Sequence, residues 1–173
     1  MTISDDSILA IFTSPGHNFF GHHGKAPEQH PMESRPAVSC VAGRGLEGDR
    51  FFDYRDSYKG QVTFFQQEVY RSLCDSLGVN DKSITVFRRN IVTRGIDLNQ
   101  LIGAVFEIQG VQFYGVEECR PCYWMNQAFG PGAEEAMAGK GGLRATIQSH
   151  GTLSAGVRQG QTLNSEALCI AGN

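Results

Sequence analysis

The residues best suited to chemistry lie in the segment Glu118–Trp124, which reads Glu-Cys-Arg-Pro-Cys-Tyr-Trp. It places two thiols, Cys119 and Cys122, on either side of Arg120 and Pro121. A thiolate is the form of cysteine that attacks electrophiles and binds metals, and a neighbouring cation favours that form. Proline fixes its own φ and biases the preceding residue towards an extended conformation, which keeps the pair out of a helix interior. This segment is therefore the first candidate site.

Four interpretations of these two cysteines are open. A structural zinc site usually has four ligands, but the remaining cysteines, Cys40, Cys74 and Cys169, are single and scattered. A thioredoxin-like redox pair needs a βαβ context, and the chain offers a strand before the cysteines but no such unit. One thiolate could instead bind a soft transition metal. The last interpretation is that both are small, half-buried side chains without chemistry, and the motifs described below argue against it.

The composition indicates an ordinary water-soluble fold. The chain has 173 residues, of which 40% are hydrophobic, and a formal net charge of −3. A chain of this size folds without disulfides or metal, so we expect one domain spanning residues 1–173. Five unevenly spaced cysteines favour a reduced, cytoplasmic setting over a disulfide framework. We expect no signal peptide, no membrane span and no broad nucleic-acid binding.

The elements that must position the cysteines are mostly short strands. Val105–Ile108 and Val111–Val116 predict two strands joined by a two-residue hairpin turn at Gln109-Gly110. Leu143–Ile147 alternates apolar and polar side chains and predicts a closing strand. Further strands are predicted at Ile8–Phe12, Pro36–Val41, Gln61–Phe65, Ile84–Phe87 and Ile91–Val92.

Helices are few. Gln66–Leu77 carries apolar residues at helical spacing, includes Cys74 on that stripe, and ends at Gly78. Gly132–Ala138 predicts a second, short helix. Many short strands with few helical connections predict a mostly β fold, a mostly antiparallel, closed or partly open β-barrel with a few short helices.

Residues 17–36 show little periodicity and predict a long loop, which is more often functional than idle. Four histidines lie in it. His-rich tracts can bind metal, but His22 and His23 are adjacent and lack the i, i+4 spacing of a helical pair. A lid over a pocket is another role for this loop, which also contains His17 and His30.

Basic residues form a second candidate site. Arg88, Arg89 and Asn90 follow the predicted strand at Ile84–Phe87, and adjacent strand residues point to opposite faces. Guanidinium groups bind phosphate through paired hydrogen bonds, and an amide can complete such a cradle, although a charged sheet edge has the same pattern. Arg50 ends the turn Gly48-Asp49-Arg50, which taken alone predicts a local ion pair.

Taken in order, these segments resemble the MOSC domain, which is named for the C-terminal part of molybdenum cofactor sulfurase. Gly45–Arg50 is similar to the family's early GxxGDR turn, and Phe87–Gly103 to its RxNLxxxGxDL…LxG segment. Cys119–Cys122 lies where the family carries its characteristic cysteine, and Gly141–Gly160 resembles its closing strands. The resemblance covers residues 8–163.

This resemblance implies a compact, mostly β barrel that binds molybdenum cofactor through a cysteine thiolate on the metal and basic residues at the pterin phosphate. Carried over, Cys122 is the metal-ligating or sulfur-carrying thiol. The residues carried over as cofactor-binding are Arg50, Arg88, Arg89, Asn90 and Arg120. The implied reaction is reduction of N-hydroxylated compounds or handling of cofactor sulfur, with a small-molecule substrate. Because the sequence shows no flavin or iron–sulfur motif, we expect any reduction to need redox partner proteins.

Departures from the family pattern keep two alternatives open. Cys119 is an additional thiol, so a thiol-redox protein that uses the Cys119/Cys122 pair is one alternative, and a non-catalytic cofactor carrier or chaperone is the other. Gln161 follows Gly160 where many relatives have Asp. We expect neither the extra N-terminal barrel of the larger N-hydroxylated-amine reductases nor the pyridoxal-phosphate module of the full sulfurase within these 173 residues.

Overall fold

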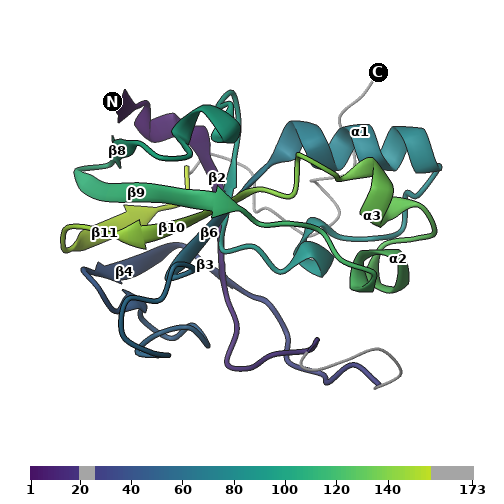
Figure 1. Ribbon diagram of the computed structural model, residues 1–173, viewed down its shortest axis with the longest axis horizontal. Coiled ribbons are helices and arrows are strands. Elements are labelled where there is room, and N and C mark those ends of the chain that lie inside the picture. Colours follow the sequence, from purple (N-terminus) through teal and green to yellow (C-terminus); the bar gives the residue numbers. More distant parts are fainter. Residues whose placement is uncertain (20–25, 157–173) are drawn as a thin grey trace.

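The computed structural model describes residues 1–19 and 26–156, which form two β-sheets and a group of short helices (Figure 1). The larger sheet is curled and has eight strands, in the order β1 (Thr2–Ile3), β8 (Val105–Ile108), β9 (Val111–Glu118), β10 (Leu143–Ile147), β6 (Val62–Gln66), β7 (Ile91–Thr93), β2 (Ile8–Thr13) and β3 (Glu33–Arg35). The smaller sheet has the order β11 (Gly151–Ser154), β4 (Ala37–Val41) and β5 (Gly45–Leu46). Most neighbouring strands are antiparallel, and β1–β8 and β6–β7 are parallel. The predicted mostly β, partly open barrel is confirmed.

The inner core fills the space enclosed by the strands. Three buried rings lie at its centre, with Phe64 5.6 Å from Phe106 and 5.5 Å from Phe113. They come from β6, β8 and β9, whose alternate residues point to the same face. Val38 and Leu153 of the smaller sheet belong to the same cluster, so this core joins the two sheets.

The outer core lies between the other face of the sheet and the helices, which Figure 1 shows together at one end of the molecule. Its helices are α1 (Gln67–Leu77), α2 (Trp124–Ala128), α3 (Ala133–Ala136) and the 3-10 helix η2 (Ile84–Phe87). Strand β2 serves both cores, since Ile8 and Ile11 point inward while Ala10 and Phe12 point outward. The register shift between Ile8 and Ala10 on its pairing with β7 accounts for the broken alternation.

Several predicted elements are confirmed. Helix α1 ends at Gly78, which adopts the left-handed conformation (φ 64°) and donates its N–H to the carbonyl of Cys74. The hairpin turn between β8 and β9 has positive φ at both Gln109 (51°) and Gly110 (76°). No helix in residues 1–19 and 26–156 has the length and apolar character needed to cross a membrane.

The predicted strand at Ile84–Phe87 is wrong, because these residues form the 3-10 helix η2. The side chain of Ser83 accepts a hydrogen bond from the N–H of Thr85 and caps the helix, a local bond that competes with strand pairing. Ile84 and Phe87, three residues apart, are then both buried in the outer core. Arg88 follows in the left-handed conformation (φ 56°), so the strand alternation predicted for residues 88–90 does not hold.

Sequence reasoning also missed short elements. Strands β1, β3 and β5 have two or three residues each, which is too short to show periodicity. The 3-10 helices η1 (Asp5–Ser7) and η3 (Leu98–Leu101) and helix α2 were not predicted. The second predicted helix exists as α3 but is shorter than Gly132–Ala138.

Candidate functional site

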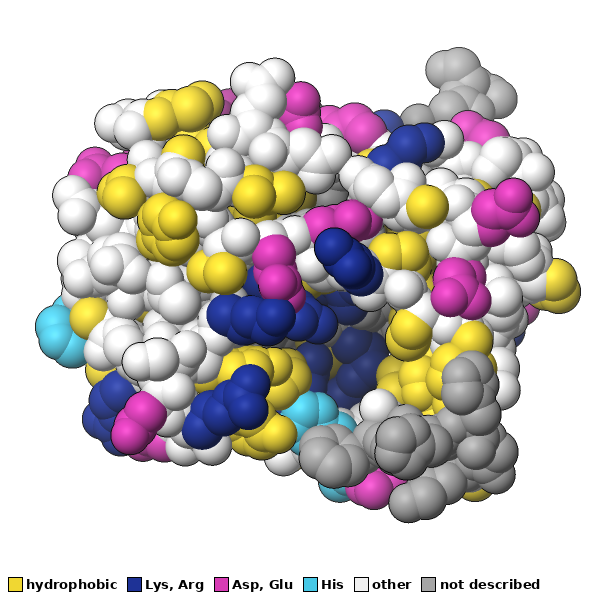
Figure 2. Space-filling view, in the orientation of Figure 1, with side chains coloured by type: hydrophobic (Ala, Val, Ile, Leu, Met, Phe, Trp, Pro, Cys, Tyr) yellow, Lys and Arg dark blue, Asp and Glu magenta, His cyan; other side chains and the backbone are white. Residues whose placement is uncertain are grey.

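A cavity of about 190 Å³ lies where the end of β9, the turn after η2 and the loop after β2 meet. Figure 2 shows a hollow in this face of the molecule with Lys and Arg side chains gathered in and around it. The cavity is lined by His17, Asn18, Phe19, Arg50, Phe51, Tyr58, Gly60, Thr63, Phe87, Arg88, Arg89, Cys119, Arg120, Pro121, Cys122, Trp124, Met125 and Arg144. Five of these residues are arginines, and none of the described lining residues is Asp or Glu.

The two cysteines lie on an irregular segment between β9 and α2, as expected for a proline-containing stretch. The N–H of Cys119 donates to the carbonyl of Gly142 at 2.7 Å, which fixes the start of the segment against the turn before β10. From there the two side chains diverge in exposure. Cys119 is buried and Cys122 is exposed, yet both line the cavity, so the sequence motif delivers both thiols to one site.

Cys119 lies deep in the wall. Burial raises the pKa of its thiol, and the guanidinium groups of Arg89 and Arg144 oppose that effect only in part. The Arg144 guanidinium is near enough to the thiol to favour its charged form. Both Cys119 and Cys122 are free cysteines in this structure. The neutral form therefore prevails at Cys119, which suits it to a supporting role rather than that of the primary thiolate.

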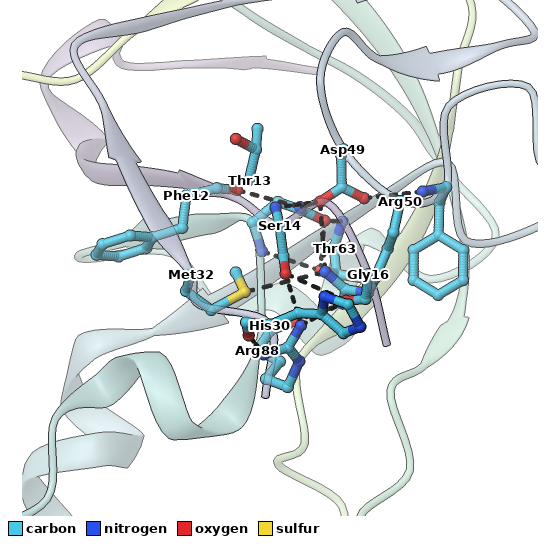
Figure 3. Close-up of polar contacts among 12 residues, drawn as sticks. Phe12, Thr13, Ser14, Gly16, His30, Met32, Asp49, Arg50, Thr63 and Arg88 are labelled. Atoms are coloured by element: carbon cyan, nitrogen blue, oxygen red, sulfur yellow. Dashed lines mark hydrogen bonds and ion pairs between the residues drawn. The ribbon is translucent and has the colours of Figure 1, made fainter. Parts of the chain in front are cut away.

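Arg88 holds the loop after β2 in place (Figure 3). Its Nη1 donates to the carbonyl of His30 at 2.7 Å, and its Nη2 donates to Ser14 Oγ and to the carbonyl of Gly16, both at 2.7 Å. Burial, reinforced by the nearby charge of Arg50, lowers the pKa of Arg88 to about 10. Arg88 thus reaches the cavity, but much of its hydrogen-bonding capacity is used to fix the wall.

Arg89 ties three other segments together. Its Nε donates to the carbonyl of Gly141 at 3.0 Å, its Nη1 to that of Phe87 at 2.7 Å and its Nη2 to that of Cys119 at 3.2 Å. These bonds link the end of η2, the cysteine segment and the turn before β10. Arg89 therefore lines the cavity and also sets the position of the cysteine segment relative to the sheet.

Arg50 comes from the GxxGDR turn. It pairs with Asp49 at 3.3 Å, as predicted, and its Nη2 donates to the carbonyl of Arg88 at 3.2 Å. The pair is buried, with side-chain exposures of 7% for Arg50 and 1% for Asp49. Burial lowers the pKa of Arg50, and the Asp49 carboxylate opposes that shift. The Arg50 guanidinium also lies 4.7 Å from the centre of the Phe51 ring.

Asn90 does not line the cavity. Its Oδ1 accepts from the N–H and the hydroxyl of Thr63 at 3.1 and 2.8 Å, and its Nδ2 donates to the carbonyl of Phe12 at 3.2 Å and to Asp49 Oδ2 at 3.0 Å. The residue is fully buried. Of the residues predicted to bind cofactor, the four arginines therefore reach the cavity. Asn90 belongs instead to the frame, by which we mean the buried residues that hold the cavity wall in place.

Arg120 and Arg144 lie on the more exposed part of the wall. Arg120 is exposed, and Arg144, on β10, has a side chain that is 35% exposed and donates through Nη1 to Glu117 Oε1 at 3.0 Å. Lys59 pairs with the same oxygen at 2.7 Å. Sequence reasoning missed Arg144 as a site residue, although its polar position on the alternating strand Leu143–Ile147 was the available signal.

The loop after β2 contributes aromatic residues. The ring of His17 lies edge-on to Phe51, with centroids 4.8 Å apart, and Phe19 lies 4.9 Å from Trp124. The loop thus contacts the wall after the GxxGDR turn and the wall after the cysteines. Burial, followed by the charges of Arg50 and Arg88, lowers the pKa of His17, so its imidazole is neutral at neutral pH.

A histidine metal site, which the spacing of His22 and His23 argued against, is tested only in part, because these two residues lie outside the described residues. His30 pairs with Glu28 at 2.9 Å, and its carbonyl accepts from Arg88. Within the described ranges, no group of three or more His, Cys, Asp or Glu is arranged to hold a metal ion.

An aromatic wall borders the cavity on the side of residues 51–58. Tyr58 lies 5.0 Å from both Phe51 and Tyr54, and the Arg55 guanidinium lies 5.1 Å from the Tyr58 ring centre. Gly60 permits this arrangement, because a Cβ there would lie 3.1 Å from the Tyr58 ring. Burial raises the pKa of Tyr58, so its phenol stays protonated at neutral pH.

Residues 22–164 match the MOSC domain family. The chain belongs to this family. The match covers both the GxxGDR turn and the cysteine segment, and it confirms the resemblance found in the sequence. No protein with a curated description shows significant sequence similarity to this MOSC domain.

Solved structures share the fold of this MOSC domain at low sequence identity. The YUAD protein from Bacillus subtilis has a TM-score of 0.66 at 12% identity, over 86% of this chain and 91% of that one. YiiM from Escherichia coli has a TM-score of 0.58 at 17% identity, over 94% and 75% of the two chains. YiiM from Geobacillus stearothermophilus has a TM-score of 0.58 at 15% identity, over 95% and 80%.

Proposed function

We propose that this MOSC domain binds molybdenum cofactor in the cavity and either reduces N-hydroxylated compounds or handles the sulfur of the cofactor. The observation that carries the proposal is one cavity lined by five guanidinium groups and two thiols, with no carboxylate among its described lining residues. Membership in the MOSC family, which is associated with this cofactor, supports the same ligand.

The residues present fit such a ligand. Arginine side chains match the oxygens of a phosphate group, and a positive, partly enclosed cavity concentrates anions. The exposed Cys122 at the same cavity is a soft sulfur donor of the kind that binds transition metals. The aromatic residues Phe51, Tyr58 and Trp124 offer flat surfaces for a planar ring system. Anion, metal and ring each have a complementary group on the wall.

In this proposal each group of residues has its own task. The bound cofactor would supply two-electron redox chemistry at its metal. Cys122 would provide the protein thiolate, and the buried Cys119 would form part of the cavity wall beside it. Arg88 and Arg89 hold the loop and the cysteine segment in position, while Arg120 and Arg144 face the ligand from the more exposed side. Electrons would come from partner proteins.

Elemental and pterin analysis tests the proposal directly. The protein would be purified anaerobically from a host that makes molybdenum cofactor, as wild type, Cys122→Ser and Cys119→Ser. We expect molybdenum and pterin in the wild type, loss of molybdenum in Cys122→Ser, and retention in Cys119→Ser. A folded wild-type protein without pterin or molybdenum would contradict the proposal, and stoichiometric molybdenum in Cys122→Ser would contradict the role of Cys122.

An activity assay on the cofactor-containing protein then distinguishes a reductase from a carrier. N-hydroxylated amines and amidines would be incubated with it and with a chemically reduced viologen as electron donor. Turnover that is absent in Cys122→Ser supports the reductase. Tight cofactor binding without turnover of any N-hydroxylated compound supports a carrier or chaperone.

A thiol-redox protein is the second candidate, because two thiols three residues apart line one cavity. In this reaction a hydroperoxide would oxidise the Cys122 thiolate to a sulfenic acid, and the Cys119 thiol would displace water to form the disulfide. This candidate predicts that one equivalent of peroxide removes two free thiols, and that a dithiol restores them. Substitution of either cysteine should then prevent disulfide formation equally.

A further inference from the structure

The five guanidinium groups of the cavity differ in what their N–H groups already bind. A guanidinium carries five donors. Arg88 uses three of them on Ser14, Gly16 and His30, and Arg89 uses three on backbone carbonyls. A ligand that drew these side chains away would leave buried backbone acceptors unsatisfied, which is costly. Both are therefore better suited to holding the wall than to exchanging partners.

Arg144 is in the opposite situation. It forms an ion pair with the carboxylate of Glu117 at 3.0 Å, and both side chains are partly exposed, 35% for Arg144 and 39% for Glu117. A carboxylate is an anionic oxygen acceptor, so it occupies Arg144 in the way that a phosphate oxygen would. Exchange of one anion for the other leaves Arg144 satisfied. Because the pair is partly exposed, breaking it costs little.

Glu117 can release Arg144 without becoming isolated. Its Oε1 also binds Lys59 at 2.7 Å, closer than it binds Arg144. The hydrogen bond from Lys59 is the main cause of the lowered pKa of Glu117, so this carboxylate keeps its charge whether or not Arg144 is present. Lys59 does not line the cavity, whereas Arg144 does. Glu117 is thus shared between a lysine outside the cavity and an arginine that lines it.

We propose that Arg144 is an exchangeable anion-binding residue of the cavity, and that Glu117 competes with the ligand for it. The ligand group is a phosphate monoester or a diphosphate, whose oxygens accept a paired hydrogen bond from the guanidinium. This inference rests on the proposed anionic ligand of the cavity but not on its metal or pterin. It makes Arg144 and Glu117 determinants of affinity and selectivity.

Calorimetric titration of the cofactor-free protein with inorganic pyrophosphate, and separately with inorganic phosphate, tests the proposal at physiological ionic strength. We expect Arg144→Met to weaken pyrophosphate binding by about tenfold to hundredfold, the range for hydrogen bonds to charged groups. Arg144→Lys keeps the charge but not the planar pair of donors, so it should recover part of the loss.

Lys59→Met is the matched control. It also removes one positive charge and one partner of Glu117, but from outside the cavity. Without Lys59, Glu117 keeps its ion pair with Arg144, so pyrophosphate affinity should fall, but by no more than about threefold, in line with the small free energy of an exposed ion pair. Equal losses in Lys59→Met and Arg144→Met would show a general effect of charge and overturn the proposal.

Glu117→Gln should change pyrophosphate affinity in the direction opposite to Arg144→Met. If Glu117 competes with the ligand, its neutralisation should tighten pyrophosphate binding by about twofold to fivefold, in line with the small free energy of an exposed ion pair. If Glu117 instead serves only to hold Arg144 in place, the same substitution should weaken binding. Weaker binding in a Glu117→Gln protein with an unchanged unfolding temperature would overturn the competition.

Pyrophosphate binding and molybdenum content are measured independently, so each can succeed where the other fails. Pyrophosphate binding that depends on Arg144, in a protein that never acquires molybdenum, would support the inference and contradict the proposed function. Suppose instead that the protein carries molybdenum and pterin, and that wild type and Arg144→Met bind pyrophosphate equally well. This result would support the proposed function and contradict the inference. Failure of the wild type to bind either anion would overturn the inference.

Discussion

Individual side chains of the family motifs divide into those that face the cavity and those that hold its frame. Arg120 and Cys122 face it and are exposed, whereas Asn90 is fully buried and Asp49 nearly so. Asp49 accepts hydrogen bonds from the N–H of Ser14 and from Asn90. These buried groups share partners, so each one depends on the others to remain satisfied. A motif residue can therefore matter to the site without contacting a ligand.

Replacement of Asn90 should test this division. Asn90→Ala removes one hydrogen bond from the Asp49 carboxylate and two from Thr63, at buried positions where water does not take their place. We expect the free energy of unfolding to fall by about 2–4 kcal/mol, as measured by urea denaturation. Asn99→Ala is the control, because its amide bonds the Gly139 carbonyl at an exposed position. A loss no larger in Asn90→Ala than in Asn99→Ala would show that the frame does not depend on Asn90.

The secondary-structure elements position the site through close backbone approaches at glycines. Gly141 lies against the carbonyl of Cys119, and a Cβ there would be 2.1 Å from that oxygen. Gly142 follows with φ +98° and would similarly meet the carbonyl of Phe64 at 2.2 Å. Both lie in the turn before β10, so this turn holds the cysteine segment against the sheet. The conformation of the turn is thus part of the cavity wall.

A methyl group at Gly141 should therefore disturb the site as well as the fold. We expect Gly141→Ala to lower the free energy of unfolding by at least about 2 kcal/mol and to increase alkylation of Cys119, because the cysteine segment must move away. Gly139→Ala is the control, since Gly139 has φ +75° but nothing within 4 Å of its Cβ position. It should cost about 1–2 kcal/mol through backbone strain. Alkylation is followed by peptide mass spectrometry, and an unreactive Cys119 in folded Gly141→Ala would contradict this account.

Across the part of the fold that the structure describes, the curled sheet separates two cores, and the outer core reaches the cavity whereas the inner core does not. Phe87 belongs to the outer core, lies 4.9 Å from Phe65 and 5.0 Å from Phe129, and lines the cavity. Phe106 belongs to the inner core, 5.6 Å from Phe64, and does not. The inner core thus holds the two sheets together, while the outer core also supports the site.

Matched substitutions in the two cores should separate stability from binding. Phe87→Leu and Phe106→Leu each remove part of a fully buried ring, so both should lower the free energy of unfolding by about 1–3 kcal/mol. Only Phe87→Leu should also weaken pyrophosphate binding at a temperature where both variants are folded. Denaturation and calorimetric titration on the same samples measure the two effects. Equal binding by the two variants would mean that the outer core does not support the cavity.

Local pattern was sufficient where structure depends on neighbours in the chain. The periodicity of Gln67–Leu77, the turn at Gln109-Gly110 and the alternation of Leu143–Ile147 each predicted the observed element. The proximity of Cys119 to Cys122 follows from their spacing, and the ordered motifs identified the family. Ile84–Phe87 failed because four apolar or β-branched residues suit a strand, while one cap at Ser83 and burial of Ile84 and Phe87 favour a 3-10 helix.

Long-range contacts decided the site. Nothing in the local sequence places Arg144 near Cys119, or Arg88 against Ser14 and His30, because these contacts form only when distant segments meet in the fold. Nor does local pattern show that Asn90 is turned away from the cavity while Arg88 and Arg89 both reach it. The types and order of the residues were enough to predict the candidate chemistry and to identify the family. The assignment of each side chain to the ligand or to the frame required the folded backbone, since burial and hydrogen-bond partners exist only there.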